Sequence, residues 1–210
     1  MTTRQRHTYD SSSLRSRRLE QAYRGIRVGL FGGSFNPAHP GHAHVAETAL
    51  KQLGLQKVWW LVTPQNPLKD ARETAPLAER IASARKHARG RAMLVSDIET
   101  RWGTRFSYDL IGKLRARYPG VHFVWILGAD NLTNFHRWRR WADIVRALPV
   151  AFAPRPGAMA RTRFSVMARR FAGARRMNAK GALAFTKAPV WTILSGPLDP
   201  HSSTALRGKR

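Results

Sequence analysis

The stretch Gly29–His42, with the sequence GLFGGSFNPAHPGH, constrains this chain more than any other, because an apolar run leads there directly into a glycine- and proline-rich loop. The run Ile26–Phe31 is apolar enough for a short buried strand, and Gly32 and Gly33 allow the backbone to turn tightly beside a ligand. Apolar residues then recur at helical spacing over His42–Leu53. We therefore predict a strand, a loop of the size that holds a phosphate, and a helix in direct succession.

The two histidines of this stretch, His39 and His42, fall at the first turn of the predicted helix. A helix N-terminus favours a bound phosphate, because unpaired amides and the positive end of the helix dipole gather there. Two imidazoles add side-chain donors at the same place. The loop lacks both the Gly-Lys-Ser/Thr end of a Walker A loop and the Gly-x-Gly-x-x-Gly pattern of dinucleotide-binding proteins. The alternative is a plain turn with two solvated histidines.

The string Gly-Gly-Ser-Phe-Asn-Pro followed by His-Pro-Gly-His resembles the His-x-Gly-His signature of the nucleotidyltransferase superfamily and, within it, the bacterial nicotinate-nucleotide adenylyltransferases. The resemblance covers residues 26–207, apart from most of 155–188. It implies that His39 and His42 act in catalysis and that Asn36 contacts the acceptor. It also implies a set of ATP-binding residues: Gly32, Gly33, Ser34, Phe35, His39 and His42.

A second motif lies near the C-terminus, in His-Ser-Ser-Thr-Ala-Leu-Arg at 201–207. Ser202 can cap a short helix whose free amides, with the hydroxyls of Ser203 and Thr204, form a second phosphate site. Arg207 follows one turn later, and its guanidinium matches phosphate geometry. The motif resembles the Ile-Ser-Ser-Thr-x-x-Arg motif of the same superfamily and departs from it at His201. The resemblance implies that Ser202, Ser203 and Arg207 bind ATP and that Arg207 is catalytic.

The clearest predicted strand is Val121–Leu127, and it ends in Gly-Ala-Asp. In open α/β sheets, ligands bind at the carboxyl ends of the strands where the strand order reverses. We expect that reversal between this strand and the first one. The family also has Gly-Ala-Asp here, which implies that Gly128 and Asp130 contact ATP. The alternative is that Asp130 only caps a helix.

The resemblance also implies residues that bind the acceptor. Lys69, in the Pro-x-x-Pro-x-Lys loop at 63–70, matches a position near the phosphates, although it is equally well explained as a surface lysine. Thr104 and Phe106 match a loop whose amides meet the acceptor carboxylate. Trp138 matches a tryptophan that stacks on the pyridine ring. Trp141 lies three residues later on the same predicted helical path, and we expect it in the core.

The remaining pattern predicts an α/β fold: one domain with a doubly wound, mostly parallel, Rossmann-like sheet. The domain is expected at 25–210, after a disordered basic N-terminal arm at 1–24. Segment 97–105 is expected to be a loop. Further strands are predicted at 57–62, 92–95, 148–153 and 190–194, and further helices at 77–89, 107–117, around 138–141 and at 161–171.

The formal net charge of +25 favours attraction to polyanions. The basic residues are dispersed and no nucleic-acid-binding motif accompanies them, so we expect no specific nucleic-acid partner. No stretch is long and apolar enough for a membrane span or a secretory signal, and cysteine is absent. These observations predict a cytoplasmic protein without a membrane partner.

The resemblance implies transfer of AMP from ATP to nicotinate mononucleotide, which gives deamido-NAD and pyrophosphate in NAD biosynthesis. It also implies Mg²⁺ that is bound with ATP rather than by protein ligands. One alternative is a sister enzyme that uses nicotinamide mononucleotide or pantetheine phosphate. Another is a basic nucleic-acid-binding protein on the same fold. The sequence leaves the oligomeric state open.

Overall fold

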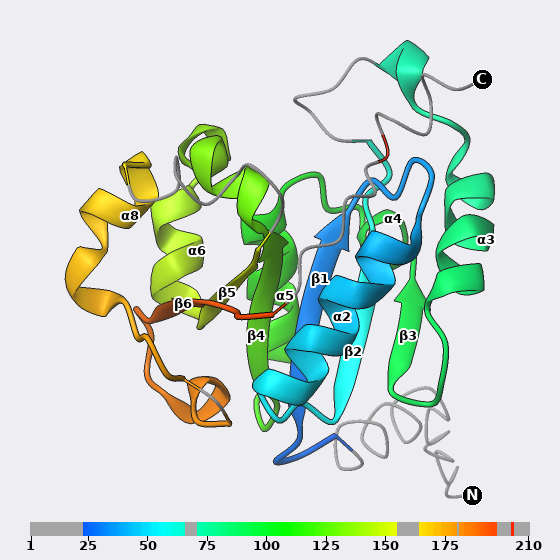
Figure 1. Ribbon diagram of the computed structural model, residues 1–210. Helices are drawn as coiled ribbons and strands as arrows, with labels where there is room; N and C mark the ends of the chain where they lie inside the picture. Colours follow the sequence, from blue (N-terminus) through cyan, green and yellow to red (C-terminus); the bar gives the residue numbers. More distant parts are fainter. Residues whose placement is uncertain (1–22, 66–70, 155–163, 180, 197–202, 204–210) are drawn as a thin grey trace, which may run out of the picture.

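The computed structural model describes residues 23–65, 71–154, 164–179, 181–196 and 203. At its centre lies a six-stranded sheet in the order β3-β2-β1-β4-β5-β6, and each neighbouring pair is parallel (Figure 1). From β1 the strands follow their sequence order toward β3 at one edge, and from β4 they follow it toward β6 at the other edge. This arrangement confirms the predicted doubly wound α/β fold and the predicted position of the strand-order reversal.

Each predicted strand is present. The strands are β1 (Arg27–Gly33), β2 (Lys57–Val62), β3 (Met93–Ser96), β4 (His122–Gly128), β5 (Val150–Ala153) and β6 (Trp191–Ile193). β2 has the predicted bounds. β1 continues past the predicted end at Phe31, because Gly32 and Gly33 still pair with Leu61 and Val62 of β2. The glycine pair therefore belongs to the end of the strand, and the turn begins at Ser34.

Helices connect the strands and cover both faces of the sheet. The α-helices are α2 (Pro40–Gln52), α3 (Leu77–His87), α4 (Ile98–Arg101), α5 (Ser107–Arg117), α6 (Trp141–Ala147) and α8 (Val166–Arg170). Short 3₁₀ helices are η1 (Ala71–Glu73), η2 (Ala129–Thr133), η3 (Phe135–Arg137), η4 (Ala172–Ala174) and η5 (Leu183–Phe185).

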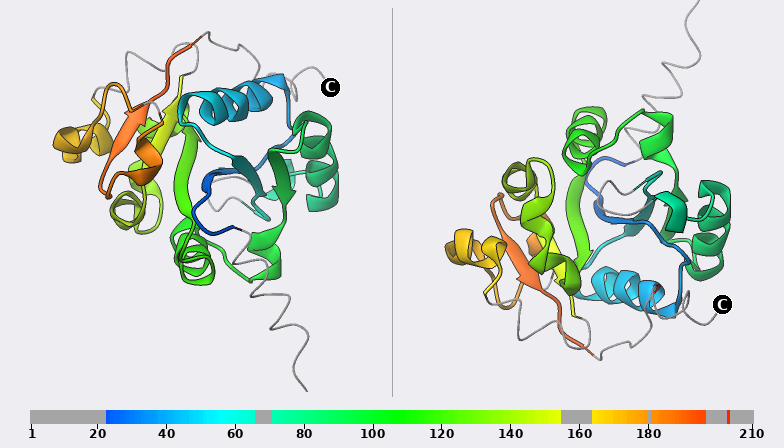
Figure 2. Two further views of the ribbon diagram at one scale, coloured as in Figure 1. Left: turned by 90° about the horizontal axis from the view of Figure 1, so that it is seen from below. Right: turned by 90° about the horizontal axis from the view of Figure 1, so that it is seen from above.

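The core has two layers, one on each face of the sheet. Strand residues alternate between the layers, as a pleated sheet requires: Leu30 and Trp59 belong to one, Phe31 and Trp60 to the other. α5 and α6 lie on the first face, and α2 on the second (Figure 2). With both faces covered, the loops at the carboxyl ends of the strands are the open edge where a ligand can bind.

Three local predictions are wrong. Segment 97–105 contains α4, because the Asp97 carbonyl accepts hydrogen bonds from the Thr100 and Arg101 amides. Within the described part of 161–171, the helix starts only at Val166. Trp138 and Trp141 do not share a helical path. Trp138 is extended after η3, and Arg140 adopts the left-handed region with φ 52° before α6 begins.

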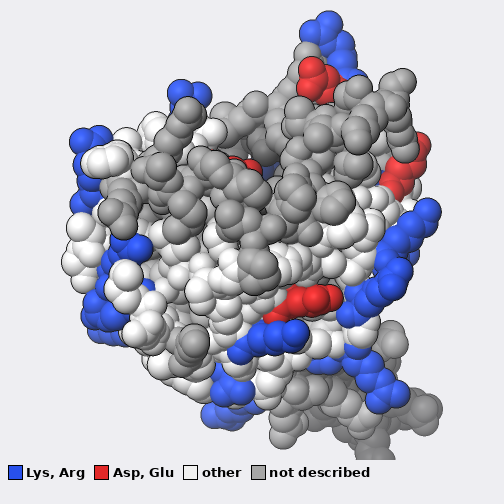
Figure 3. Space-filling model, viewed as in Figure 1, with Lys and Arg blue, Asp and Glu red and all other residues white. Residues whose placement is uncertain are grey.

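No helix among the described residues is long and apolar enough to cross a bilayer. On the face seen in Figure 3, the described Lys and Arg side chains lie in several separate groups, some of them beside Asp or Glu side chains. This distribution agrees with the dispersal of basic residues along the sequence. The predicted arm falls almost wholly outside the described residues, but Tyr23 packs edge to face against Trp59 at 5.6 Å between ring centroids.

Candidate active site

The side chain of Phe35 joins the loop after β1 to an aromatic cluster, which consists of Phe31, Phe35 and Trp60. Phe35 has φ 47°, a left-handed conformation that a bulky residue rarely adopts, and only 2% of it is exposed. Its ring stacks on Trp60, with 5.2 Å between centroids and 29° between planes. A Cβ on Gly33 would lie 3.1 Å from the Phe35 ring. Glycine at position 33 therefore leaves room for the Phe35 ring. The strained backbone conformation of Phe35 is of a kind that is common at functional sites.

The two histidines meet at the start of α2. His39 precedes the helix and is buried, whereas His42 is half-buried, and their ring centroids lie 3.8 Å apart. The His39 amide donates to Nδ1 of His42 at 3.3 Å. In a neutral imidazole only one nitrogen carries a proton, so this bond places the proton of His42 on Nε2. His42 can therefore act as an Nε2–H donor at the helix N-terminus.

The C-terminal motif reaches the same loop. The Ser203 hydroxyl donates to the Pro37 carbonyl at 3.0 Å, across 166 positions of sequence. Ser203 thus lies beside the turn that leads into His39 and His42. The other predicted residues of the terminal motif, Ser202 and Arg207, lie outside the described residues, as does Lys69.

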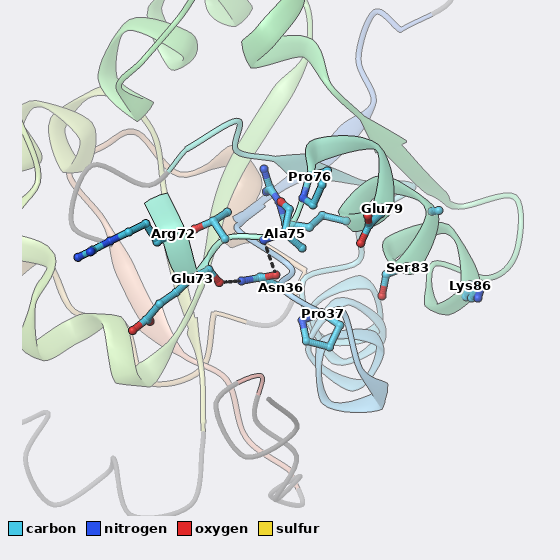
Figure 4. A pocket seen from close by; sticks show the side chains of 12 residues that line it. Asn36, Pro37, Arg72, Glu73, Ala75, Pro76, Glu79, Ser83 and Lys86 are labelled. Carbon is cyan, nitrogen blue, oxygen red and sulfur yellow. Dashed lines mark hydrogen bonds between the residues drawn. The ribbon is translucent and has the colours of Figure 1, made fainter. Parts of the chain in front are cut away.

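Asn36 is held by the last residue of η1 and by the segment that follows it (Figure 4). Its Nδ2 donates to the Glu73 carbonyl at 2.7 Å, and its Oδ1 accepts from the Ala75 amide at 3.2 Å. The side chain borders a pocket of about 750 Å³ between the loop and α3. Asn36 therefore shapes the loop through both ends of its amide, and its predicted contact with the acceptor stays a prediction.

The predicted acceptor residues come from two neighbouring segments. The Arg139 guanidinium lies 4.8 Å from the centroid of the Phe106 ring, which brings the loop before α5 beside the segment that carries Trp138. Trp138 is half-buried and packs edge to face on Phe135 at 5.3 Å. The amide and hydroxyl of Thr104 both donate to the Glu99 carbonyl, at 2.9 and 3.3 Å, and its predicted contact with the acceptor stays a prediction.

Gly128 and Asp130 lie at the carboxyl end of β4, next to β1 in the sheet. Gly128 is buried and Asp130 is exposed at the start of η2. Both residues therefore lie at the carboxyl edge of the sheet, where the loop after β1 also begins. Among the residues that the structure describes, no three His, Asp or Glu side chains gather closely enough to hold a metal ion.

Arg80 of α3 was not predicted, although it organises this edge of the sheet. Only 2% of it is exposed, and it donates to four backbone carbonyls: Ala75 at 2.8 Å, Ser34 at 2.8 Å, Thr63 at 2.7 Å and Pro64 at 2.6 Å. Burial lowers the pKa of the guanidinium from its usual value. The only sequence signal is that Arg80 and the buried Ala84 are four residues apart on one helix face.

Glu99 of α4 is a second buried charged residue that the sequence did not reveal. It is 4% exposed, and the Thr63 hydroxyl donates to its Oε1 at 3.3 Å. Burial raises the pKa of this carboxyl from 4.5 to about 7, and the Thr63 hydrogen bond opposes the shift. Folding therefore shifts Glu99 toward its protonated form, and near pH 7 the protonated and ionised forms are about equally populated.

Replacing Glu99 with Gln should remove a pH dependence of stability. Since the folded pKa lies above the unfolded one, the contribution of the carboxyl is fully present below pH 4.5 and lost as pH rises through about 7. Glu99→Gln should have the same free energy of unfolding as the wild type at pH 4.5. At pH 8 its free energy of unfolding should be about 1–3 kcal/mol higher than that of the wild type. Urea titrations across this range measure the difference. The exposed Glu79→Gln should show none; equal stabilities of Glu99→Gln and wild type at pH 8 would contradict the assignment.

Comparison with known proteins places these features in a family. The family described as cytidylyltransferase-like matches residues 30–209. A protein of Caulobacter sp. (strain K31) is 60% identical over 186 residues, which are 88% of this chain and 98% of that protein. A protein of Rhizobium meliloti (strain 1021) is 51% identical over 186 residues, which are 88% of this chain and 99% of that protein. Both are named probable nicotinate-nucleotide adenylyltransferase.

Solved structures share the fold. Plasmodium falciparum nicotinic acid mononucleotide adenylyltransferase complexed with APC has a TM-score of 0.62 and 15% identity, over 87% of this chain and 83% of that chain. The structure of the same protein complexed with NaAD has a TM-score of 0.64, with the same identity and coverage. At this identity the likeness establishes the doubly wound architecture.

Proposed function

The chain belongs to the cytidylyltransferase-like family and, within it, to the nicotinate-nucleotide adenylyltransferases, and we propose that it transfers AMP from ATP to nicotinate mononucleotide. The products are deamido-NAD and pyrophosphate. Relatives of 60% and 51% identity that align over nearly their whole length support this activity. The dispersed charge and the intact histidine motif speak against a degenerate nucleic-acid-binding protein on this fold.

The observation that carries the proposal is the hydrogen bond between Ser203 and Pro37. It joins the two motifs that the sequence analysis assigned to phosphates, although they stand at opposite ends of the chain. A triphosphate needs donors on more than one side, and here a helix N-terminus, two imidazoles and a serine hydroxyl converge on one turn. Gly32, Gly33 and Ser34 border the same turn, and we assign them with Ser202 and Arg207 to ATP.

In the proposed reaction, the acceptor phosphate attacks the α-phosphorus of ATP. A phosphate monoester has a second pKa of about 6 and is largely dianionic at neutral pH, so no general base is required. Catalysis then depends on positioning and on neutralising charge as the bond to pyrophosphate breaks. We assign the donation to that charge to Nε2 of His42, with His39 holding the His42 ring in place.

We propose that Mg²⁺ enters with ATP. The donors near the turn are imidazoles, amides and a hydroxyl rather than clustered carboxylates, and this set fits a metal that is held mainly by phosphate oxygens. When bound, the ion would neutralise charge on the triphosphate. We also propose a cytoplasmic location, which the absence of cysteine and the biosynthetic reaction support.

A pyrophosphate-release assay with a panel of acceptors tests the activity. Purified chain, ATP and Mg²⁺ should release pyrophosphate with nicotinate mononucleotide, and deamido-NAD should form in equal amount. Nicotinamide mononucleotide and pantetheine phosphate should support much slower release. Faster release with either of these two would replace the proposed acceptor, and no release with any acceptor would refute the proposed enzyme class.

Trp138→Ala should weaken acceptor binding and leave stability nearly unchanged, because the ring is only half-buried and we assign it to the acceptor. A stacked aromatic pair contributes about 0.5–1.5 kcal/mol, so the KM for nicotinate mononucleotide should rise about threefold to tenfold. The KM for ATP should not change. Trp125→Ala is the control for a core tryptophan, since Trp125 is fully buried in β4 and its loss should lower the melting temperature instead. If Trp138→Ala lowers the melting temperature and preserves both KM values, Trp138 supports the core and does not bind the acceptor.

A further inference from the structure

We propose that Arg80 is a positioning residue for ATP: its guanidinium fork fixes the backbone of the loop after β1 so that the loop can receive the triphosphate. The inference rests on the proposed function only in naming ATP as the phosphate ligand. Arg80 lies on α3, outside the two motifs in the sequence, and it acts through the loop rather than by touching the substrate.

The fork joins three segments that form the carboxyl edge of the sheet. Nη1 donates to the carbonyls of Ser34 and Thr63, which follow β1 and β2. Nη2 donates to Pro64, and Nε donates to Ala75 in the segment before α3. Four of the five guanidinium N–H groups are therefore committed to main-chain carbonyls. Lysine carries three donors on one nitrogen and cannot reproduce this planar pattern.

The charge of Arg80 has no carboxylate partner among the described residues, since each of its contacts there is a neutral carbonyl. A buried charge without a counter-ion is costly. A binding site for a polyanionic ligand close by explains why a positive charge lies beneath this loop, because the ligand would supply the missing negative charge.

The bond to Ser34 also orients an amide. The Ser34–Phe35 peptide is trans and planar, so its C=O and N–H point in opposite directions. With the carbonyl held by Arg80, the Phe35 N–H points away from α3, and it has no acceptor among the described residues. A turn that contains a left-handed residue commonly presents such amides to an anion. Arg80 thus orients a main-chain donor at the turn that leads to His39.

Other contacts hold the same loop and define what Arg80 adds. The Thr63 amide donates to the Gly33 carbonyl at 3.0 Å, and the Ala38 amide donates to the Ser83 hydroxyl at 3.1 Å. The Asn36 amide binds the segment before α3 (Figure 4). These contacts fix the loop on either side of Ser34 and Phe35. Without Arg80 the loop should stay attached, but the peptide between Ser34 and Phe35 would lose the one hydrogen bond that it makes within the described residues.

Direct binding of a non-hydrolysable ATP analogue to Arg80→Lys and Arg80→Met tests the inference. Both variants should bind the analogue at least about tenfold more weakly than the wild type, since a small misplacement of donors has effects of this size or larger. Acceptor KM should change less than twofold. Arg85→Lys and Arg85→Met are the matched controls, because Arg85 lies on the same helix and is exposed; they should bind normally.

The outcomes separate a positioning role from a merely stabilising one. A lower melting temperature with wild-type affinity for the analogue would overturn the inference, and so would normal binding by Arg80→Lys. Should Arg80→Met not fold, Arg80→Lys decides the question, because it keeps the charge and loses only the fork. The measurement needs no acceptor. If the wild type binds the analogue but releases no pyrophosphate with any acceptor, the proposed function fails while the inference on Arg80 is still decided.

Discussion

His42→Ala is expected to lower the turnover number by about a hundredfold or more and to change the KM for ATP far less, because a donor to charge that develops in the transition state acts mainly on the rate. The hydrogen bond from the His39 amide to Nδ1 leaves Nε2–H as the donating group of His42. The His42 ring also packs edge to face with Phe35, with 5.0 Å between centroids, so the aromatic cluster sets the orientation of His42. Steady-state pyrophosphate release with both substrates varied measures the two parameters separately.

His44→Ala is the matched control for this experiment. His44 is half-buried on the same helix, two residues further along, and belongs to neither phosphate motif. It should keep turnover within about twofold of the wild type, as substitutions outside functional features usually have small effects. Near-normal turnover in a folded His42→Ala protein would remove His42 from the phosphate site and would leave the role of the opening motif to its backbone.

The sequence predicted the parts of the fold that follow a simple hydrophobic period. β2 and α5 have their predicted bounds because apolar runs and helical spacing end cleanly at Val62 and Arg117. α4 has only four residues and was missed, since one turn contains too little spacing to establish a period. Trp138 and Trp141 share helical spacing, but the left-handed Arg140 between them interrupts the helix, and arginine gives no sign of that conformation.

The site was predictable where its residues form contiguous motifs, and not where tertiary contacts create it. The histidine and serine motifs could be identified as strings, and the contact between Ser203 and Pro37 brings them together. Arg80 and Glu99 look like ordinary surface charges of two polar helices. Their importance comes from burial and from carbonyl or hydroxyl partners on other segments, which no local pattern encodes. Such residues become visible only once the neighbouring loops are in place.

Trp60 shows how strongly the site depends on the core beneath it. The residue is fully buried in the middle of β2, stacks on Phe35, and meets Phe31 edge to face at 5.3 Å. One layer of the core and the loop after β1 therefore share this side chain. Its indole N–H is buried and has no hydrogen-bond partner among the described residues. Removing the ring should thus destabilise the whole domain, whereas removing only the N–H should remove the free-energy cost of burying an unpaired donor.

Trp60→Ala is expected to lower the free energy of unfolding by about 3–5 kcal/mol, the usual loss when a buried tryptophan is truncated. The melting temperature should fall by roughly 6–20 °C, as about 2–4 °C is lost per kcal/mol in a domain of this size. Trp60→Phe should lose much less, because it keeps an aromatic ring against Phe35 and removes an unpaired buried N–H that costs about 1–3 kcal/mol. Urea unfolding of both variants, with Trp138→Ala as the half-buried control, measures the difference. Equal losses in Trp60→Ala and Trp60→Phe would mean that the ring stacked beneath Phe35 is not what supports the loop.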